Sequence, residues 1–192
     1  HAGATVLVCD DALQHHALHK SLSLLVVDGG YGFGNGRLLP AGPLREPLAA
    51  ALARSHAVIV IGGAAMAPLT PAIPHFYGHL APVGEVAALA SQHVLAFAGI
   101  ARPEKFFDTL RSLGAQLVAT RIFADHHPYQ EAELAALAAE ASALKARLIT
   151  TEKDAVKLPP AWRDRISVLP VALALEDAPA LQAFLAAHIA NT

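Results

Sequence analysis

Cysteine is almost missing from this sequence, since Cys9 is the only one among its 192 residues. A single cysteine excludes a disulfide framework and a cysteine-rich zinc module. It also favours, weakly, a reducing compartment. The sequence has no His-Glu-x-x-His motif and no other zinc-ligand spacing, so zinc chemistry is not expected.

Charge is also scarce. Asp, Glu, Lys and Arg make up 16% of the residues, the formal net charge is −2, and no strongly basic cluster is present. Nucleic acid is therefore not an expected partner. Hydrophobic residues reach 54%, which excludes disorder, and a chain of this length can bury about 70% of its unfolded surface.

Residues 55–84 contain no Asp, Glu, Lys or Arg at all. They do contain Gly62-Gly63 and four prolines, at positions 68, 71, 74 and 82. These residues break helices, whereas a spanning helix needs about 20 continuous apolar residues. No signal-peptide pattern is present either. We therefore expect a soluble protein.

Short apolar runs alternate with helical patterns along the chain, which predicts an α/β fold with a parallel sheet. The expected strands are residues 5–9, 24–28, 57–61, 94–98, 116–123, 147–150 and 166–175. The expected helices are residues 48–54, 103–113, 131–146 and 181–189, with another opened by Thr151 as N-cap. The proline-rich stretch is the best candidate for a domain boundary. It divides the chain into residues 1–67, a linker at 68–92, and a second domain at 93–192.

The first candidate site follows the first expected strand. Asp10 and Asp11 come directly after an apolar run, and Gln14 and His15 follow them. Ligands bind at the carboxyl ends of parallel strands. Two carboxylates at such an end match a Walker-B arrangement, which holds Mg²⁺ against nucleotide phosphates. The alternative is that both aspartates cap a turn or a helix, and the residues alone favour neither.

The second candidate is the glycine- and proline-rich loop over residues 29–47. Its Gly32-x-Gly-x-Gly motif lacks the strand, loop and helix order of a phosphate-binding fingerprint, so turn-forming glycines are the favoured interpretation. Arg45 and Glu46 at its end are candidates for a phosphate contact and a metal ligand. By themselves they are better explained as a surface ion pair.

Two further candidates follow later strands. Asp125-His126-His127 comes after the strand at 116–123, where a histidine could orient a catalytic carboxylate or a substrate hydroxyl. The alternative is a helix-entry aspartate with exposed histidines. Thr150-Thr-Glu-Lys-Asp154 is explained mostly by helix capping, with a ligand contact by Thr150 or Lys153 as the less favoured option.

Taken together, these segments resemble the tetraacyldisaccharide 4′-kinase family, the lipid A 4′-kinases. Five motifs in chain order carry the resemblance: Asp10-Asp-x-x-Gln-His15, Gly32-x-Gly-Asn-Gly with Leu38-Leu-Pro-Ala-Gly-Pro-Leu-Arg-Glu-Pro47, Ala98-Gly-Ile with Pro103 and Phe106-Phe107, Phe123-Ala-Asp-His126, and Thr150-Thr-Glu-Lys-Asp154. The run from Leu38 to Pro47 is long and specific. The resemblance covers about residues 6–157.

The resemblance implies a P-loop-kinase-like parallel sheet and a second α/β domain, joined by a two-stranded linker. It implies transfer of the γ-phosphoryl group of ATP, with Mg²⁺, to the 4′-hydroxyl of an acylated glucosamine disaccharide at the cytoplasmic face of the bacterial inner membrane. By match to the family motifs, Asp10, Asp11 and Glu46 would serve the metal, and Arg45 would face the phosphates. Gln14 and His15 would line the same site, and His126 would partner a catalytic aspartate. Asp10 and Asp11 would also be catalytic.

One departure is large. The family carries a GxxxxGK[ST] P-loop, and this chain contains no Gly-Lys dipeptide. The catalytic aspartate and the membrane-associating helix of the family have no matching position either, and Ala12 replaces the glycine usual after the second aspartate. The chain, which begins without Met, is therefore interpreted as the C-terminal portion of such an enzyme, with little or no kinase activity alone and with membrane contact through a segment outside it.

Two other functions remain open on sequence grounds. One is a non-catalytic module, derived from this kinase, that binds an acyl-sugar or a partner protein. The other, an NAD-dependent enzyme, rests on fold class alone.

Overall fold

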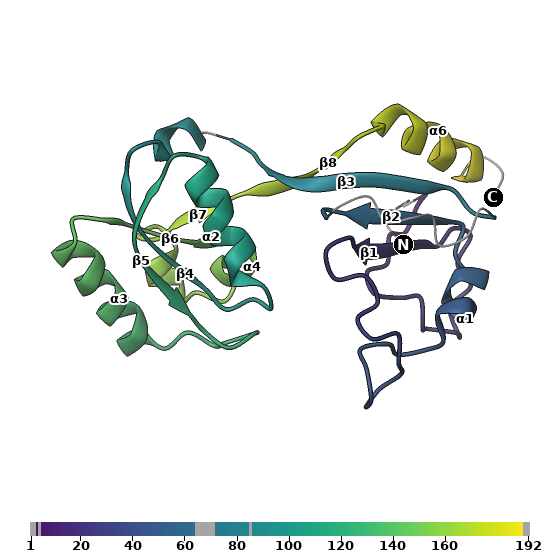
Figure 1. Ribbon diagram of the computed structural model, residues 1–192, viewed down its shortest axis with the longest axis horizontal. Coiled ribbons are helices and arrows are strands. Elements are labelled where there is room, and N and C mark those ends of the chain that lie inside the picture. The colour runs from purple at the N-terminus through teal and green to yellow at the C-terminus, as the bar shows by residue number, and fades with distance from the viewer. Residues whose placement is uncertain (1–2, 4, 64–71, 85, 190–192) are drawn as a thin grey trace. The chain divides into compact units, whose positions relative to one another are not determined.

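A computed structural model describes residues 3, 5–63, 72–84 and 86–189 (Figure 1). The chain forms two compact units. The first consists of His1–Leu80 together with Leu173–Thr192, and the second is Ala81–Ala172. The expected boundaries differ from these units, because the last 20 residues were assigned to the second domain. Residues 64–71, where the first expected domain meets the linker, lie outside the described residues.

The second unit is built on a parallel sheet of four strands in the order β5-β4-β6-β7. These strands are β4 (His93–Ala98), β5 (Gln116–Ile122), β6 (Arg147–Thr151) and β7 (Ser167–Leu169). Successive side chains of a strand point to opposite faces. Val94, Ala96 and Ala98 accordingly join one core cluster, while Leu95 and Phe97 join the other. The expectation of a parallel α/β sheet is confirmed here.

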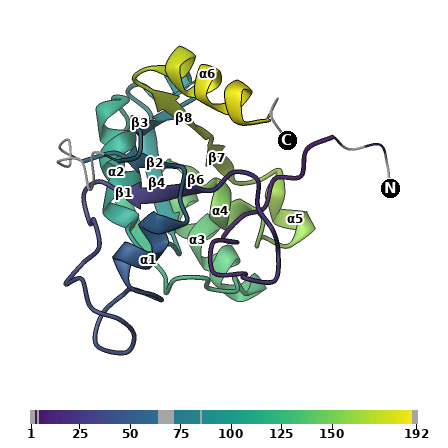
Figure 2. The same cartoon turned by 90° about the vertical axis from the view of Figure 1, so that its right-hand side faces the viewer.

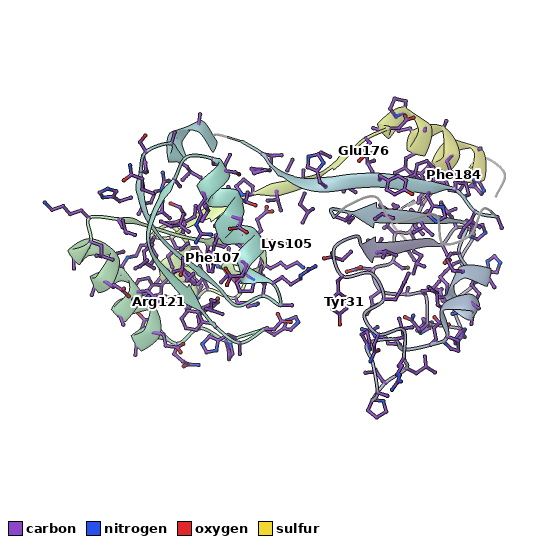
Figure 3. All side chains as sticks on the ribbon, in the orientation of Figure 1. Tyr31, Lys105, Phe107, Arg121, Glu176 and Phe184 are labelled. Atoms are coloured by element: carbon purple, nitrogen blue, oxygen red, sulfur yellow. The ribbon has the colours of Figure 1, made fainter. Side chains whose placement is uncertain are left out.

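Helices cover both faces of this sheet (Figure 1). Helix α2 (Pro103–Ser112) packs Phe106, Phe107 and Leu110 on one face, and Figure 3 shows Phe107 beneath this helix. Helices α3 (Glu131–Ala143) and α5 (Pro160–Arg163) supply Leu134 and Trp162 to the other. The unit also contains the short helix α4 (Glu152–Ala155) and a 3₁₀ turn, η1 (Val86–Leu89). The sheet is thus buried on both faces, as parallel sheets usually are.

The first unit contains a sheet in the order β1-β2-β3-β8. Its strands are β1 (Leu24–Asp28), β2 (Ala57–Ile61), β3 (His75–Pro82) and β8 (Val171–Leu175), and its helices are α1 (Leu48–Ala53) and α6 (Ala178–Ile189). The β1–β2 and β2–β3 pairs are parallel. Helix α6 lies beside β3 and β8 (Figure 2). The ring centroids of Phe184, in α6, and Phe76, in β3, are 5.5 Å apart.

Two expectations were wrong. Residues 5–9 form no strand, and Val6, Leu7 and Val8 are 51%, 79% and 89% exposed. A strand needs a neighbour to accept its backbone hydrogen bonds, and none of the described strands pairs with this segment. The run 166–175 is divided at Pro170, which has no N–H to donate, so β7 and β8 join different sheets. Strand β3 lies within the expected linker, which the family resemblance describes as two-stranded, so it does not contradict that expectation.

None of the helices in the described ranges combines the length and the apolar character needed to cross a bilayer.

Candidate active site

The loop after β1 carries the residues predicted to meet phosphates and metal. Asp28 starts it, because its carboxylate Oδ1 accepts the N–H of Gly30 at 2.8 Å. Gly34 has a φ of 59°, a conformation glycine adopts without cost, and a Cβ there would come within 2.8 Å of the Pro43 ring. No helix directly follows these glycines. The turn-forming interpretation agrees with this geometry.

The same loop then folds back on itself. The Leu44 N–H donates to the Arg37 carbonyl at 3.1 Å, and the Leu39 N–H donates to the Leu44 carbonyl at 2.9 Å. The return places Arg45 and Glu46 immediately before helix α1. Two side chains that are far in sequence from residues 10–15 are thereby presented next to them.

Glu46 is the centre of a small polar group. Gln14 Nε2 donates to Glu46 Oε1 at 2.9 Å, and the Arg54 guanidinium pairs with Glu46 Oε2. The hydrogen bond from Arg54 is the main reason that the pKa of Glu46 is held below its usual value, against a smaller opposing effect of burial. The structure therefore brings together the predicted Gln14 and Glu46. It adds Arg54, which belongs to none of the motifs found in the sequence.

A second pair, Asp11 with Arg45, joins the same two segments of the chain as Gln14 and Glu46. Arg45 Nη1 donates to Asp11 Oδ2 at 2.7 Å, and the two side chains are 66% (Asp11) and 58% (Arg45) exposed. Exposed pairs of this kind contribute about 0–1 kcal/mol, so either partner can be given up to a ligand at little cost. Asp10 and His15 are exposed, and the backbone of His15 closes a turn by donating to the Ala12 carbonyl at 3.0 Å.

The predicted metal ligands do not form a ready-made cluster. Within the part of the chain that the structure describes, no three His, Cys, Asp or Glu side chains converge. Mg²⁺ is commonly held by one or two carboxylates together with substrate phosphates and water, and exposed Asp10 and Asp11 suit that pattern. Glu46 already accepts hydrogen bonds from Arg54 and Gln14, so a metal ion would compete with these donors or use the remaining lone pairs of the carboxylate.

The two adjacent histidines after β5 have different surroundings. His127 Nε2 lies 2.9 Å from Glu133 Oε2, and its ring stacks 4.9 Å from that of Phe123. The His126 side chain is 88% exposed and its Nε2 lies 3.8 Å from Asp125 Oδ2. Residue type alone does not separate these neighbours, and His126 was selected by its match to the family motif. The packing gives His127 structural contacts, and the catalytic role of His126 stays a prediction.

The Thr150–Asp154 segment is mostly turned inward. Thr150 Oγ1 donates to the Phe97 carbonyl at 2.8 Å and is buried, whereas Lys153 is exposed. Thr151 is the N-cap of α4, as predicted, with its side-chain oxygen accepting the Asp154 N–H at 3.2 Å. Thr150 therefore satisfies its hydroxyl within the fold.

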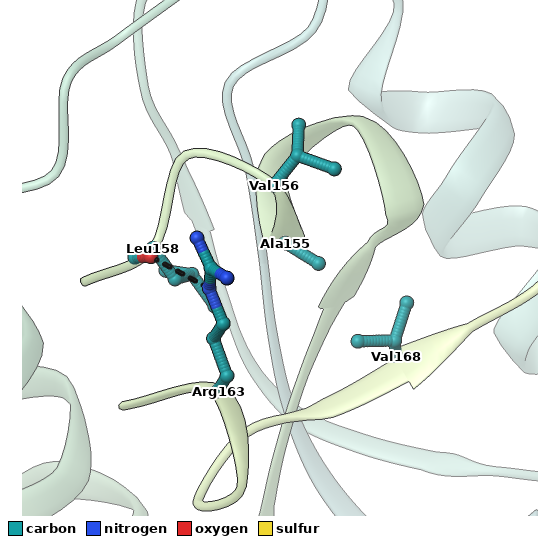
Figure 4. Close-up of a pocket in the computed structure, with 5 residues that line it drawn as sticks. All are labelled: Ala155, Val156, Leu158, Arg163 and Val168. Carbon is teal, nitrogen blue, oxygen red and sulfur yellow. Dashed lines mark hydrogen bonds between the residues drawn. The ribbon is translucent and has the colours of Figure 1, made fainter. Parts of the chain in front are cut away.

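Two hollows are present in the second unit, with volumes of about 260 and 270 Å³. The first is lined by Ala155, Val156, Leu158, Arg163 and Val168 (Figure 4). Both are smaller than ordinary ligand pockets, which span about 300–1,000 Å³. None of the predicted site residues lines either hollow. They do not alter the choice of candidate residues.

Comparisons with known proteins agree with these motifs. The tetraacyldisaccharide 4′-kinase of Rhodospirillum rubrum is 50% identical over 191 residues, which cover 96% of this chain and 58% of that protein. The enzyme of the same name from Rhodospirillum centenum is 51% identical over 189 residues, covering 96% and 56%. The chain thus spans a little over half the length of these relatives.

A solved structure shares the fold. It is the crystal structure of an "apo" form of LpxK from Aquifex aeolicus in complex with ATP, which superposes with a TM-score of 0.66 at 23% identity over 93% of this chain and 56% of that one. A family model described as tetraacyldisaccharide-1-P 4′-kinase matches residues 1–190. With the motif residues in place on an α/β fold, this match shows that the chain belongs to the tetraacyldisaccharide-1-P 4′-kinase family.

Proposed function

We propose that this chain serves the ATP-dependent phosphorylation of the 4′-hydroxyl of a tetraacylated glucosamine disaccharide 1-phosphate, a step of lipid A and lipopolysaccharide biosynthesis. One observation carries the proposal. In a chain that matches the family model over residues 1–190, residues singled out by their motifs pair with each other, Asp11 with Arg45 and Gln14 with Glu46. A chance match to the motifs gives no reason for these contacts.

The charges in this region suit phosphoryl transfer, which depends on positioning and on neutralising the phosphate oxygens. Asp10 and Asp11 would hold Mg²⁺, which when bound supplies positive charge to the phosphates. Arg45 is exposed and weakly paired, so its guanidinium can turn from Asp11 to a phosphate. Arg54 holds the Glu46 carboxylate in place and ionised. Gln14 donates a hydrogen bond to that carboxylate, and Gln14 and His15 would line the same site.

His126 is proposed to orient the catalytic base. Its exposed ring carries two nitrogens, either of which can form a hydrogen bond with a carboxylate. The base itself has no matching position in this chain, and the sequence contains no GxxxxGK[ST] motif to hold the β- and γ-phosphates. We therefore propose that the 192-residue chain alone has little or no kinase activity. The site of action is proposed to be the cytoplasmic face of the bacterial inner membrane, with peripheral contact through a segment outside this chain.

The test is transfer of labelled γ-phosphate from ATP to the tetraacyldisaccharide 1-phosphate in detergent micelles. The protein is used as its gene encodes it, beside the 192-residue chain. His126→Ala is expected to lower kcat roughly 10²–10⁴-fold, the usual contribution of acid–base groups. Asp11→Asn should weaken the dependence on Mg²⁺.

A matched control is Asp108→Asn, which removes an exposed carboxylate paired with Arg111 on α2 and should leave the rate unchanged. Undiminished transfer by His126→Ala and Asp11→Asn would contradict the proposed roles. Binding of the disaccharide without any transfer would instead favour the non-catalytic module.

A further inference from the structure

Asp154 is a buried carboxylate that the proposed function does not use. Its side chain is 0% exposed. Three donors reach it: the Gly99 N–H at 3.1 Å, Thr151 Oγ1 at 2.8 Å and Lys157 Nζ at 3.0 Å. Burying an unpaired carboxylate has a very high free-energy cost. The three donors therefore allow Asp154 to be buried in its ionised form. We call Gly99, Thr151, Asp154 and Lys157 the Asp154 cluster.

The carboxylate of this cluster is ionised at neutral pH. Burial by itself would raise the pKa of Asp154, but hydrogen bonds from Thr151, Lys157 and Gly99 together outweigh burial and bring it below the ordinary value. Its charge is also felt by Tyr129, whose pKa is raised by burial first and by the nearby Asp154 second. A fixed ion pair therefore sits at the carboxyl edge of the sheet, between β4 and β6.

Gly99 connects this ion pair to the loop that carries His126. Its carbonyl accepts both Lys157 Nζ, at 3.2 Å, and the backbone N–H of His126, at 3.3 Å. Only glycine fits here, because a Cβ would come 2.9 Å from the Tyr129 hydroxyl and 3.0 Å from the Ala124 carbonyl. Gly99 is thus hydrogen-bonded to Asp154 and Lys157, and its carbonyl also accepts the backbone N–H of His126.

The backbone of His126 needs such support. Its φ is 60°, a conformation that residues other than glycine rarely adopt. The Asp125 carboxylate also accepts its N–H, at 3.1 Å. Unfavourable backbone conformations persist only where the surroundings fix them, and they gather at functional sites. The exposed imidazole is therefore attached to a backbone that is fixed more firmly than its exposure suggests.

We propose that the Asp154 cluster positions His126: Asp154 fixes Lys157, and both hold the Gly99 peptide that anchors the His126 backbone. This inference rests on the proposed role of His126. Asp154 and Lys157 are positioning residues, since neither touches the reacting atoms. The alternative is that the cluster only caps α4 and stabilises the second unit. In that case its removal would lower stability without any specific effect on His126.

Steady-state kinetics of the protein as its gene encodes it separate the two roles. Lys157→Met is expected to lower kcat about tenfold or more, the size of a lost hydrogen bond to a charged group, with KM for ATP and for the disaccharide changed less than about twofold. Lys157→Arg keeps the positive donor and should restore most of kcat. An unchanged kcat in Lys157→Met, or no rescue by arginine, would overturn the proposal.

Amide hydrogen exchange tests the cluster independently of activity. Asp154→Asn should speed exchange at His126 and Gly99 about tenfold or more, while Ile149 in β6 keeps its protection. The matched control is Asp108→Asn. Asp108 pairs with Arg111 at i,i+3 spacing on the surface, whereas Asp154 pairs with Lys157 at the same spacing in a buried position. Equal acceleration at all three amides would show general destabilisation and overturn positioning.

The two proposals can fail separately. If His126→Ala retains full activity, the catalytic role of His126 fails, whatever the amide exchange shows. If His126→Ala is inactive but Lys157→Met and Asp154→Asn leave both kcat and the His126 amide unchanged, the positioning role fails alone.

Discussion

Two ion pairs, Asp154–Lys157 in the second unit and Asp11–Arg45 in the first, lie in opposite settings. In the second unit the Asp154–Lys157 pair is buried, with side chains 0% and 21% exposed. In the first, Asp11 and Arg45 are 66% and 58% exposed. Removing one partner of a buried ion pair lowers the free energy of unfolding strongly, whereas removing one partner of an exposed pair lowers it little. The buried pair therefore fixes a backbone, and the exposed pair is free to exchange partners with a ligand.

The hydrophobic cores differ in the same direction. The second unit packs two clusters, one on each face of its sheet, with Phe97, Phe107, Leu110 and Leu134 almost fully buried. The fully buried apolar core of the first unit is small and built on Val27, Val58 and Val60. Burial of apolar area is the main source of stability. The second unit should accordingly be the more stable one.

Truncation of the two cores should give the largest effect. Phe107→Ala in the second unit is expected to cost about 3–5 kcal/mol of unfolding free energy, because it leaves a cavity under α2. Val60→Ala in the first unit removes less apolar surface and should cost about 2 kcal/mol. In urea unfolding, circular dichroism follows both units, and the fluorescence of Trp162, the one tryptophan, follows the second unit, in which it lies. Equal costs would break the contrast between the units.

The buried ion pair should come next. Asp154→Asn is expected to cost about 3 kcal/mol at pH 7, the lower end for breaking a buried pair. The pKa of Asp154 is lowered on folding, so its stabilising contribution is complete above the ordinary value of 3.8 and is lost as the pH falls through the lower folded pKa. Unfolding monitored by Trp162 from pH 7 to pH 3 should show a shallower acid loss in the variant. An unchanged pH dependence would contradict this account.

Glu46→Gln in the first unit should be milder, at about 1 kcal/mol or less, because Arg54 and Glu46 are partly in contact with water. The pKa of Glu46 is also lowered, chiefly by Arg54. Its contribution is therefore present above the ordinary value of 4.5 and is lost as the pH falls through the folded pKa. Exchange rates of the β1 and β2 amides at pH 7 and pH 4 report it. If Glu46→Gln lowered the free energy of unfolding as much as Asp154→Asn, the contrast between the two ion pairs would be contradicted.

The smallest effect is expected for Tyr129→Phe. The Tyr129 hydroxyl is buried and makes no hydrogen bond of ordinary geometry within the described residues, although Asp154 is near enough to raise its pKa. Removing a hydroxyl without a partner is nearly neutral, so the unfolding free energy should change by less than about 0.5 kcal/mol. A loss above about 1 kcal/mol would mean that this hydroxyl stabilises the Asp154 carboxylate.

Strand positions were predictable where the pattern was local. Strands β1 and β2 have the bounds read from their β-branched runs, and β4 begins one residue earlier than expected. Residues 5–9 have the same composition without being a strand, since pairing depends on a neighbour and not on the run itself. Likewise, the sequence of α6 predicted a helix, but the pattern did not indicate which of the two units the helix packs against.

The candidate site was predictable as a set of residue types rather than as a set of contacts. The motifs located Gln14 and Glu46, but Arg54 has no motif and joined them only through folding. The family motif selected His126 rather than His127, and the contacts of His127 with Glu133 and Phe123 came only with the fold. Asp154 was assigned to helix capping, and its burial beside Gly99 depends on a residue 55 positions away.

The chain passes between the units twice, in β3 and again in β8, and these two strands are hydrogen-bonded neighbours. Ala81–Ala172 is therefore an insertion within the first unit, and both of its ends emerge side by side. Such an insertion can be gained, exchanged or deleted as one module, because a short turn from β3 to β8 would restore a continuous chain. The unit that carries His126 could thus have had a history separate from that of the unit that carries the two aspartates.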